Sequence, residues 1–344
     1  MKCRYYESEQ AYHLQGIAGE VVFCPKLKVI PGYRPECYEM HRLYNNRQDA
    51  AENSIYSVYL DNVRAGWVFP VQALFSNQHD YAENEYFLRY AFIAYMKFFE
   101  NIKEDDLFSY AEDDINECFS HFVDADQQMV LIDLENVRAI DGYQFKHYIP
   151  GFFAKGYVTK KGAYKFTRLQ ELDKNLKIKR ISSVLADVAY LYEFFNEVLV
   201  SCPRGYPLFH ALYQIVELLI YRIFGSEFNR LLSSYQDSDD PFQAKERIME
   251  LINERYRVTK LFSEYIQHGD SESERELNAA CRRFLNKCQG KTVNDLSGNL
   301  YNTRCLLVHR LYTVKVDDFA LLDEINEAFI ELIYHVLVNF RERQ

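Results

Sequence analysis

The spacing of hydrophobic and polar positions changes about halfway along the chain. Between residues 19 and 75, short runs rich in Val, Ile, Tyr and Phe are separated by Pro and Gly, which is typical of β-strands joined by turns. After residue 181, apolar residues recur every three or four positions, as on the buried faces of packed helices. The pattern predicts an α+β first half and a helical second half. The strands are expected in "GEVVFC", "KLKVI", "SIYSVYL" and "GWVFPVQALF".

Longer elements complete the expected fold. The first half is expected to hold helices over 83–102 and 110–123 and a buried strand in "QQMVLIDLENV". The fold class is therefore mainly α, with a C-terminal helical bundle over 181–344 preceded by an α+β domain over 1–180, to which we assign no fold. The second half is expected to be helical over 182–200, 207–235, 242–266, 272–288, 296–312 and 317–340.

Composition narrows the class of protein. The chain of 344 residues is 48% hydrophobic and 26% charged, as in folded soluble proteins, and its net charge of −10 confines any nucleic-acid site to a local patch. The eight Cys include no CxxC pair, so we expect no structural zinc and no other metal or cofactor. The N-terminus lacks the apolar core of a signal peptide, and the longest apolar run is too short to cross a bilayer. A cytoplasmic protein with no membrane contact is expected.

Residues 151–180 are basic within this acidic chain. Only Glu171 and Asp173 oppose nine Lys and Arg residues. Such a segment is commonly a solvated face or a linker; the alternative is contact with RNA, since Lys neutralises phosphate and aromatic rings stack on bases. The candidates for phosphate contact are Lys160, Lys161, Lys165 and Arg168, and the candidates for stacking are Phe152, Tyr157, Tyr164 and Phe166.

The stretch "LYNTRCLLVHRLY", residues 300–312, combines an apolar helix pattern with a polar stripe. Asn302, Cys305, His309 and Tyr312 are spaced by three, four and three residues and share one helix face, with Arg304 beside them. A helix that buries its Leu and Val residues would therefore carry a permanent cation and an imidazole. The ordinary explanation is an Arg paired to an acid and a satisfied core His; the functional one is a catalytic pair.

This stretch resembles the signature of the HEPN superfamily, in which Arg, usually a polar residue, three to five further residues and His follow one another. Here the signature is Arg304, Cys305, three residues and His309, late in a domain of several helices, as in that family. The resemblance covers residues 183–344 and implies a bundle of about four or five helices. It departs from the family at Cys305, where Asn, Asp or His is usual.

The resemblance implies a function. HEPN proteins include metal-independent ribonucleases of bacterial defence and toxin systems, in which Arg and His from two protomers meet at a dimer interface. It implies that Arg304 and His309 are catalytic, that RNA is cut to leave 2′,3′-cyclic phosphate ends, and that the protein is a homodimer that a regulatory partner can bind. The expected supporting residues are Tyr301, Asn302 and Cys305.

Three alternatives stay open at the level of sequence. Because a thiol is a poor hydrogen-bonding group, Cys305 favours a non-catalytic HEPN module that serves assembly or partner binding. Asp133 and Glu135 are either paired carboxylates for a metal or, as we prefer, structural residues. Glu217 and Arg222 are interpreted as interhelical ion-pairing residues, with support of the site as the alternative.

Overall fold

The computed structural model describes residues 2–6, 8, 11–16, 19–23, 34–46, 54–74, 78–100, 126–162, 175–235, 241–266 and 272–342. These residues fall into two compact units. The first comprises the described parts of Met1–Gln144, Gly156–Lys160 and Gln170–Lys179; the second comprises those of Phe145–Lys155, Lys161–Leu169 and Arg180–Gln344. The helical unit therefore begins before the expected boundary at residue 180, because Phe145–Lys155 clusters with it.

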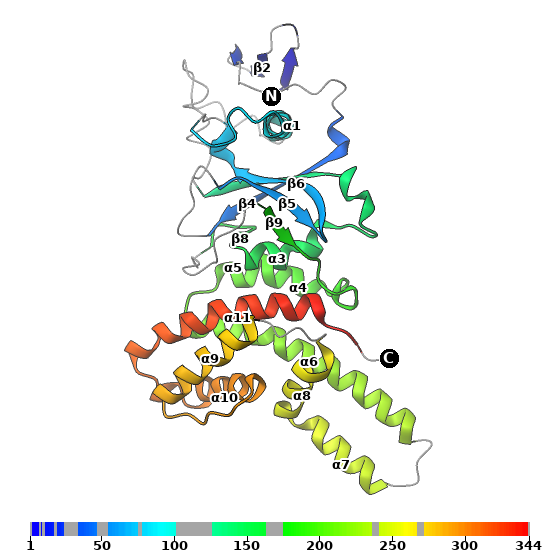
Figure 1. Ribbon diagram of the computed structural model, residues 1–344, viewed down its shortest axis with the longest axis vertical. Coiled ribbons are helices and arrows are strands. Elements are labelled where there is room, and N and C mark those ends of the chain that lie inside the picture. The colour runs from blue at the N-terminus through cyan, green and yellow to red at the C-terminus, as the bar shows by residue number, and fades with distance from the viewer. Residues whose placement is uncertain are drawn as a thin grey trace. The chain divides into compact units, whose positions relative to one another are not determined.

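The first unit is built on a curled six-stranded sheet (Figure 1). Its strand order is β8-β4-β7-β6-β5-β9, and all neighbours are antiparallel except β5 and β9. A separate three-stranded sheet is formed by β1 (Lys2–Tyr6), β2 (Ala11–Gly16) and β3 (Gly19–Phe23). The strands of the larger sheet are β4 (Tyr38–Asn45), β5 (Tyr56–Leu60), β6 (Val63–Pro70), β7 (Gln127–Asp133), β8 (Tyr157–Val158) and β9 (Asn175–Ile178).

Helix α1 (Glu85–Glu100) covers one face of this sheet. The Asn84 side chain caps the helix by accepting hydrogen bonds from the backbone N–H groups of Tyr86 and Phe87, at 3.0 and 3.1 Å. Trp67 and Phe69 lie two residues apart in β6, so both side chains point to the face of the sheet that α1 covers. The ring of Phe87 meets both of them edge-on, so an aromatic core joins helix and sheet.

Several expectations for the first half need correction. The run "GWVFPVQALF" is not one strand, because β6 ends at Pro70 and a 3-10 turn, η2 (Val71–Leu74), follows. The expected strand from residue 127 likewise ends at Asp133, before the 3-10 turn η4 (Asn136–Ala139). Strands β1, β2, β4, β8 and β9 had no counterpart in the prediction. The expected strand over 26–30 and helix over 110–123 lie outside the described residues.

The second unit is helical. After the 3-10 turn η5 (Phe145–Tyr148) come α3 (Ile149–Ala154), η6 (Ser183–Leu185), α4 (Ala189–Glu193), the π-helical turn η7 (Phe194–Val198) and α5 (Leu199–Ser201). Next are α6 (Tyr206–Tyr235), α7 (Pro241–Ile252), α8 (Glu254–Lys260) and the π-helical turn η8 (Leu261–Tyr265). The unit ends with α9 (Glu272–Lys287), α10 (Leu296–His309), the 3-10 turns η9 (Leu311–Thr313) and η10 (Val316–Asp318), and α11 (Ala320–Asn339).

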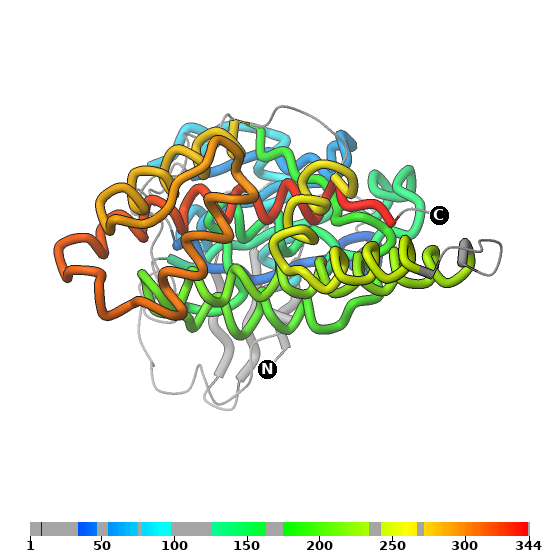
Figure 2. The backbone as a smooth tube through the Cα atoms, turned by 90° about the horizontal axis from the view of Figure 1, so that it is seen from below, coloured from blue at the N-terminus to red at the C-terminus, as the bar shows by residue number. Residues whose placement is uncertain are grey.

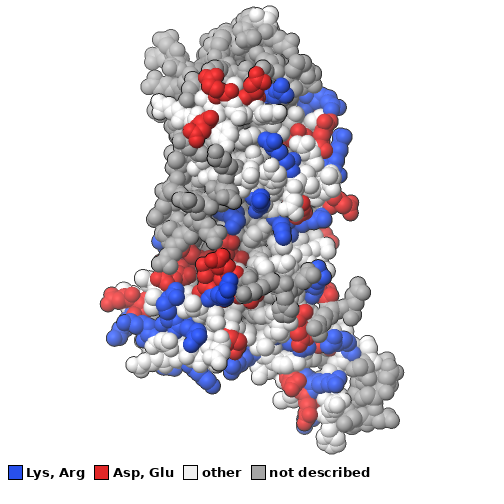
Figure 3. All heavy atoms as spheres, viewed as in Figure 1, with Lys and Arg blue, Asp and Glu red and all other residues white. Residues whose placement is uncertain are grey.

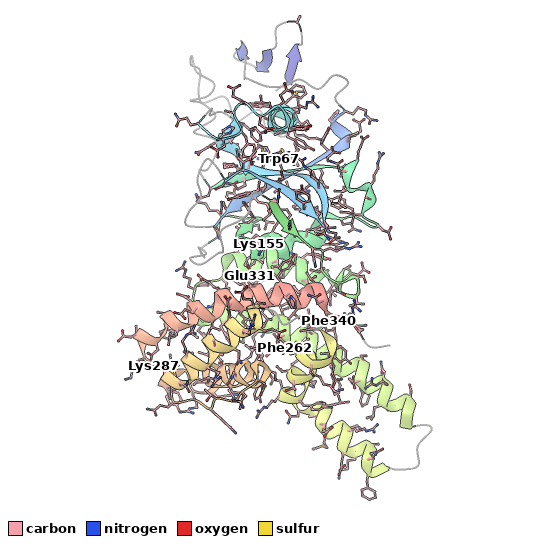
Figure 4. The ribbon with its side chains drawn as sticks, in the orientation of Figure 1. Trp67, Lys155, Phe262, Lys287, Glu331 and Phe340 are labelled. Atoms are coloured by element: carbon pink, nitrogen blue, oxygen red, sulfur yellow. The ribbon has the colours of Figure 1, made fainter. Side chains whose placement is uncertain are left out.

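Helix α11 is the centre of this unit and packs against α9, α6 and α3. Lys155, just after α3, points toward Glu331 of α11, and their charged atoms lie 3.3 Å apart (Figure 4). Helix α7 returns along the C-terminal part of α6 (Figure 2). Within the described residues, Tyr206–Ser233 of α6 is long and apolar enough to cross a bilayer, but 56% of that window is buried inside the protein.

The prediction of a mainly α protein with an α+β first half is confirmed in outline. Two expected helices are broken. Residues 182–200 form short pieces around the π-helical turn η7. Residues 242–266 divide at Asn253, whose side chain caps α8 by accepting from the Tyr256 N–H. Helix α10 ends at His309, three residues before the expected end at 312.

Candidate functional site

Helix α10 carries the Arg304 and His309 pair, and its start is fixed by Asp295. The Asp295 carboxylate accepts hydrogen bonds from the Gly298 N–H at 2.7 Å and the Ser297 hydroxyl at 2.6 Å. A side chain on Gly298 would place its Cβ 2.5 Å from a methyl carbon of Val293, so glycine is required for this tight entry. The beginning of the helix is therefore set by local sequence chemistry.

The loop before α10 is fastened to the helix by two Asn side chains. Asn299, fully buried, accepts from the Val293 N–H at 2.9 Å and donates to the Val293 carbonyl at 2.9 Å and to Asn278 at 2.7 Å. Asn302 donates to the Lys291 carbonyl at 2.8 Å. The amide N–H of Asn302, an expected supporting residue, thus holds the loop that carries Lys291.

Arg304 points from α10 toward α6 and α8. Its Nη2 lies 3.3 Å from Glu217, and its Nε lies 3.8 Å from Glu254. The guanidinium carbon lies 5.7 Å from the centre of the Tyr213 ring, and the Tyr213 hydroxyl donates to Glu254 at 3.1 Å. The interpretation of Arg304 as a residue paired to an acid is therefore confirmed. Its Nη1 donors make no hydrogen bond within the described part of the chain.

The electrostatic balance of this cluster keeps Arg304 charged. Burial alone would lower the pKa of Arg304, but the carboxylates of Glu254 and Glu217 raise it overall. Burial also raises the pKa of Tyr213, with Glu254 adding to the effect. Glu217 engages the guanidinium through Nη2 and Glu254 through Nε, so the Nη1 donors are the ones left to meet an anion.

His309 is the last residue of α10 and is exposed to solvent. Within the described residues its imidazole makes no hydrogen bond and no ion pair. The interpretation of His309 as a satisfied core residue is therefore wrong. The helix stops here because the following residue, Arg310, leaves the helical conformation with a ψ of 25° and a φ of −136°.

The remaining residues of the predicted stripe separate. The Tyr301 hydroxyl hydrogen-bonds to the Cys305 thiol one turn later, and this contact, followed by burial, raises the pKa of Tyr301. Tyr312 lies in η9, beyond the end of α10, and its side chain is 85% exposed. Because the helix ends at His309, Tyr312 does not continue the face that holds Cys305.

The described residues of the basic segment 151–180 are divided between the core and the surface. Phe152 and Tyr157, two of the expected stacking residues, are buried in the core. Lys160 and Lys161 are exposed, whereas Lys165 and Arg168 lie outside the described residues, as do the other two aromatic candidates. The end of the segment forms β9, an edge strand whose Leu176 and Ile178 are buried, so part of this segment is structural.

Asp133 and Glu135 have structural roles, as preferred from the sequence. Asp133 accepts from the backbone N–H groups of Glu135 and Asn136, at 2.9 and 3.4 Å. Glu135 accepts from Arg34 at 2.6 Å. Among the residues that the structure describes, no group of three or more His, Cys, Asp and Glu is arranged to hold a metal ion.

Sequence reasoning missed two members of the Arg304 cluster. Glu254 and Tyr213 reach Arg304 from α8 and α6, and their local sequence carries no signal of that contact. Glu217 was singled out, but it pairs with Arg304; Arg222 instead pairs with Glu342, at 2.6 Å. Both are ion-pairing residues, each with a partner outside α6.

Comparison with known proteins adds no relative. No protein-family model, no curated protein and no solved structure matches this chain.

Proposed function

We propose that this protein is a HEPN-type endoribonuclease that cuts RNA without a metal ion and leaves 2′,3′-cyclic phosphate ends. The observation that carries the proposal is the exposed imidazole of His309, which has no partner among the described residues, at the end of the helix that also holds Arg304. An imidazole titrates near neutral pH and can transfer protons only where substrate reaches it. His309 meets this requirement of access.

The two side chains have different roles in the proposed reaction. His309 takes the proton from the 2′-hydroxyl or gives one to the leaving 5′-oxygen. Arg304 stabilises the negative charge that develops on the phosphate, using the Nη1 edge that Glu217 and Glu254 leave open. The two carboxylates are positioning residues, since they hold the guanidinium through Nη2 and Nε.

A homodimer is part of the proposal. Five residues along an α-helix correspond to about 1.4 turns, so Arg304 and His309 of one chain leave α10 in different directions. Arg304 is directed toward α6 and α8, while His309 lies at the free end. A two-fold pairing of α10 brings the Arg304 of one protomer toward the His309 of the other and supplies both an acid and a base.

A non-catalytic assembly module is the second candidate. Cys305 stands where the family signature usually has a polar residue, and its thiol is engaged with Tyr301. Near the end of α10, Val308 and Val316 are exposed, which suits a protein contact as well. In this alternative Arg304 is a structural ion-pairing residue and RNA is not cut.

Cleavage in EDTA separates the two candidates. The wild-type protein is expected to cut total RNA or tRNA in EDTA, with 2′,3′-cyclic phosphate ends identified by mass spectrometry. His309→Ala and Arg304→Ala are each expected to reduce the rate about a hundred-fold or more, since each removes a group that acts in the transition state. Arg304→Lys keeps a cation beside Glu217 and Glu254 and is expected to lose activity while remaining folded.

Matched controls test whether any loss is specific. His210→Ala removes another exposed imidazole, on α6, and Arg222→Ala removes another half-exposed, ion-paired guanidinium. Both are expected to cut at the wild-type rate. Wild-type cleavage by the His309 and Arg304 variants would refute the assigned residues, and the absence of cleavage by the parent would leave the assembly module as the function.

A further inference from the structure

Residues 277–316 are strongly basic within an acidic chain. They contain seven Lys and Arg residues and a single acid, Asp295, whereas the whole chain has 40 cations and 50 anions. Asp295 is already engaged as the cap of α10. Figure 3 shows Lys and Arg gathered over the part of the helical unit that holds α9 and α10, at the lower left. The excess of Lys and Arg in this part of the sequence is therefore also present on the surface of the protein.

Five of these cations make no ion pair with any residue that the structure describes. Arg283 is held by Glu324 at 2.9 Å and Arg304 by Glu217. The other five side chains are exposed and have no ion-pair partner within the described part of the chain. We call them the basic cluster: Arg282, Lys287, Lys291, Arg310 and Lys315.

Helix packing brings Lys287 of the cluster to the end of α10. Asn278 in the first half of α9 contacts Asn299 in the first half of α10. Further along, a Cβ on Gly290 would lie 2.8 Å from Leu285 of α9 and 3.1 Å from Leu306 of α10. The two helices therefore run parallel, with their C-terminal ends adjacent. This places Lys287 of α9 at the end of α10 that carries His309 and Arg310. The Lys291 carbonyl lies beside Asn302, about two turns before that end.

An exposed aromatic ring lies within the cluster. Tyr312 is 85% exposed and follows Arg310 by two residues and precedes Lys315 by three. Cations near helix C-termini also offset the helix dipole, but that effect explains neither Lys315, which lies outside a helix, nor an exposed ring. Unpaired cations around an exposed aromatic ring are the elements of a single-strand binding surface, in which phosphates contact the cations and a base stacks on the ring.

We propose that the basic cluster and Tyr312 bind single-stranded RNA beside His309. The ligand is a flexible strand because a base must be free of its own stack to lie on Tyr312. The inference deepens the proposed function by placing the substrate, and it rests on that function only for the cleavage that follows binding. It also assigns RNA contact to α9, α10 and the segments that follow them, and not to the 151–180 segment.

Binding is measured separately from cleavage. His309→Ala protein in EDTA is titrated into a labelled, unstructured RNA of about 15 nucleotides and followed by fluorescence anisotropy. In this background, Arg310→Gln with Lys315→Gln is expected to lower the slope of log affinity against log salt by roughly 1.4, about 0.7 for each phosphate that is no longer neutralised. Raising salt from about 50 to 200 mM then weakens the variant about seven-fold less than its parent.

The matched control removes one Arg and one Lys from another exposed helix. Lys245→Gln with Arg247→Gln on α7 is expected to leave the salt slope unchanged. Tyr312→Leu is expected to weaken single-strand binding roughly five-fold or more, with little effect on a duplex of the same length. An unchanged slope in the Arg310 and Lys315 variant would overturn the proposal, as would an equal decrease in the control.

The failure of this inference is distinguishable from the failure of the proposed function. If RNA binds through the cluster in a salt-dependent way but the wild-type protein does not cut it, the proposed ribonuclease activity is refuted and the RNA-binding surface is supported. If the protein cuts RNA and the cluster variant binds RNA as the parent does, the ribonuclease activity is supported and the RNA-binding surface is refuted. If phosphatidylserine vesicles compete with RNA in the parent, and the cluster variant alters only vesicle binding, the surface recognises a membrane and the proposal fails.

Discussion

Glu227 and Lys260 form a buried ion pair in the helical unit, with charged atoms 2.9 Å apart and side chains 7% and 9% exposed. Tyr265 donates to the same carboxylate at 2.7 Å. Burial raises the pKa of Glu227, but the hydrogen bonds from Tyr265 and Lys260 outweigh it and lower that pKa overall. At the scale of single residues, the carboxylate is therefore held ionised by its partners.

Removal of one partner tests this balance. Lys260→Met is expected to reduce the free energy of unfolding by roughly 3 to 5 kcal/mol, because the Glu227 carboxylate loses its buried counterion and keeps Arg230, which is largely solvated. Arg230→Met is the control, since Arg230 pairs with the same carboxylate but is 52% exposed, and it should cost about 1 kcal/mol or less. Urea denaturation followed by circular dichroism measures both. Equal effects would contradict the assignment of Lys260 as the principal partner.

The same pair has a pH dependence with a defined sign. Because the pKa of Glu227 is lowered in the folded state, its contribution is present above the ordinary value of 4.5 and is lost as the pH falls through the lowered pKa. The pKa of Lys260 is raised despite burial, so its contribution persists from neutral pH into the alkaline range. The stability difference between wild type and Lys260→Met should therefore shrink below about pH 4.5 and not near pH 8.

Elements owe their positions to irregular turns as well as to periodicity. Lys260 directly precedes η8 and Tyr265 ends it. A π-helical turn, whose hydrogen bonds join residues five apart, places both side chains on the side of Glu227. In the first unit, Gly66 of β6 pairs with Val58 of β5 at a register shift, since the next pair, Tyr59 with Arg64, passes over Ala65 of β6. A Cβ on Gly66 would lie 1.8 Å from the Leu131 carbonyl oxygen of β7. The close approach of β6 and β7 thus depends on a missing side chain.

Two Gly-to-Ala substitutions are expected to act in opposite directions. Gly66→Ala should destabilise the first unit strongly, because its Cβ meets backbone atoms that cannot move without breaking the β6–β7 ladder. Gly225→Ala in α6 places its Cβ in open space, where alanine should stabilise the helix by roughly 0.5 to 1 kcal/mol. Thermal denaturation compares them. A Gly66→Ala protein as stable as wild type would disprove the contact with Leu131.

The charge of the whole molecule is distributed unevenly. A chain with a net charge of −10 repels RNA at long range, yet seven of its 40 cations lie within residues 277–316. In a two-fold dimer formed through α10, the clusters of both protomers and both Arg304 and His309 pairs would line one surface. Dimer formation would then create an extended RNA-binding surface that a single chain lacks.

Subunit exchange tests this assembly. Equal amounts of His309→Ala and Arg304→Ala protein are mixed after each is shown to be inactive. Random exchange makes half of the dimers mixed, and each mixed dimer has one intact pair of two, so cleavage of up to about a quarter of the wild-type rate should return. Light scattering measures the mass in parallel. A monomer that still cuts RNA, or a mixture that stays inactive, would refute a shared site.

The sequence alone determined the larger elements and the candidate pair. Helices α6, α9 and α11 follow from apolar positions three and four apart, and β7 follows from an unbroken apolar run. The placement of Arg304 and His309 on one helix was readable for the same reason. The spacing of apolar residues indicates which side of a helix or strand is buried, and this spacing can be read from the local sequence alone.

Tertiary structure decided which groups meet. It placed Glu254 of α8 against Arg304, and it turned the end of the basic segment into β9 beside β5. It made α9 and α10 parallel, so that Lys287 lies near the end of α10 although a run of residues separates them in sequence. Contacts between elements depend on packing of many side chains at once, and the local pattern of any one segment carries no record of its partner.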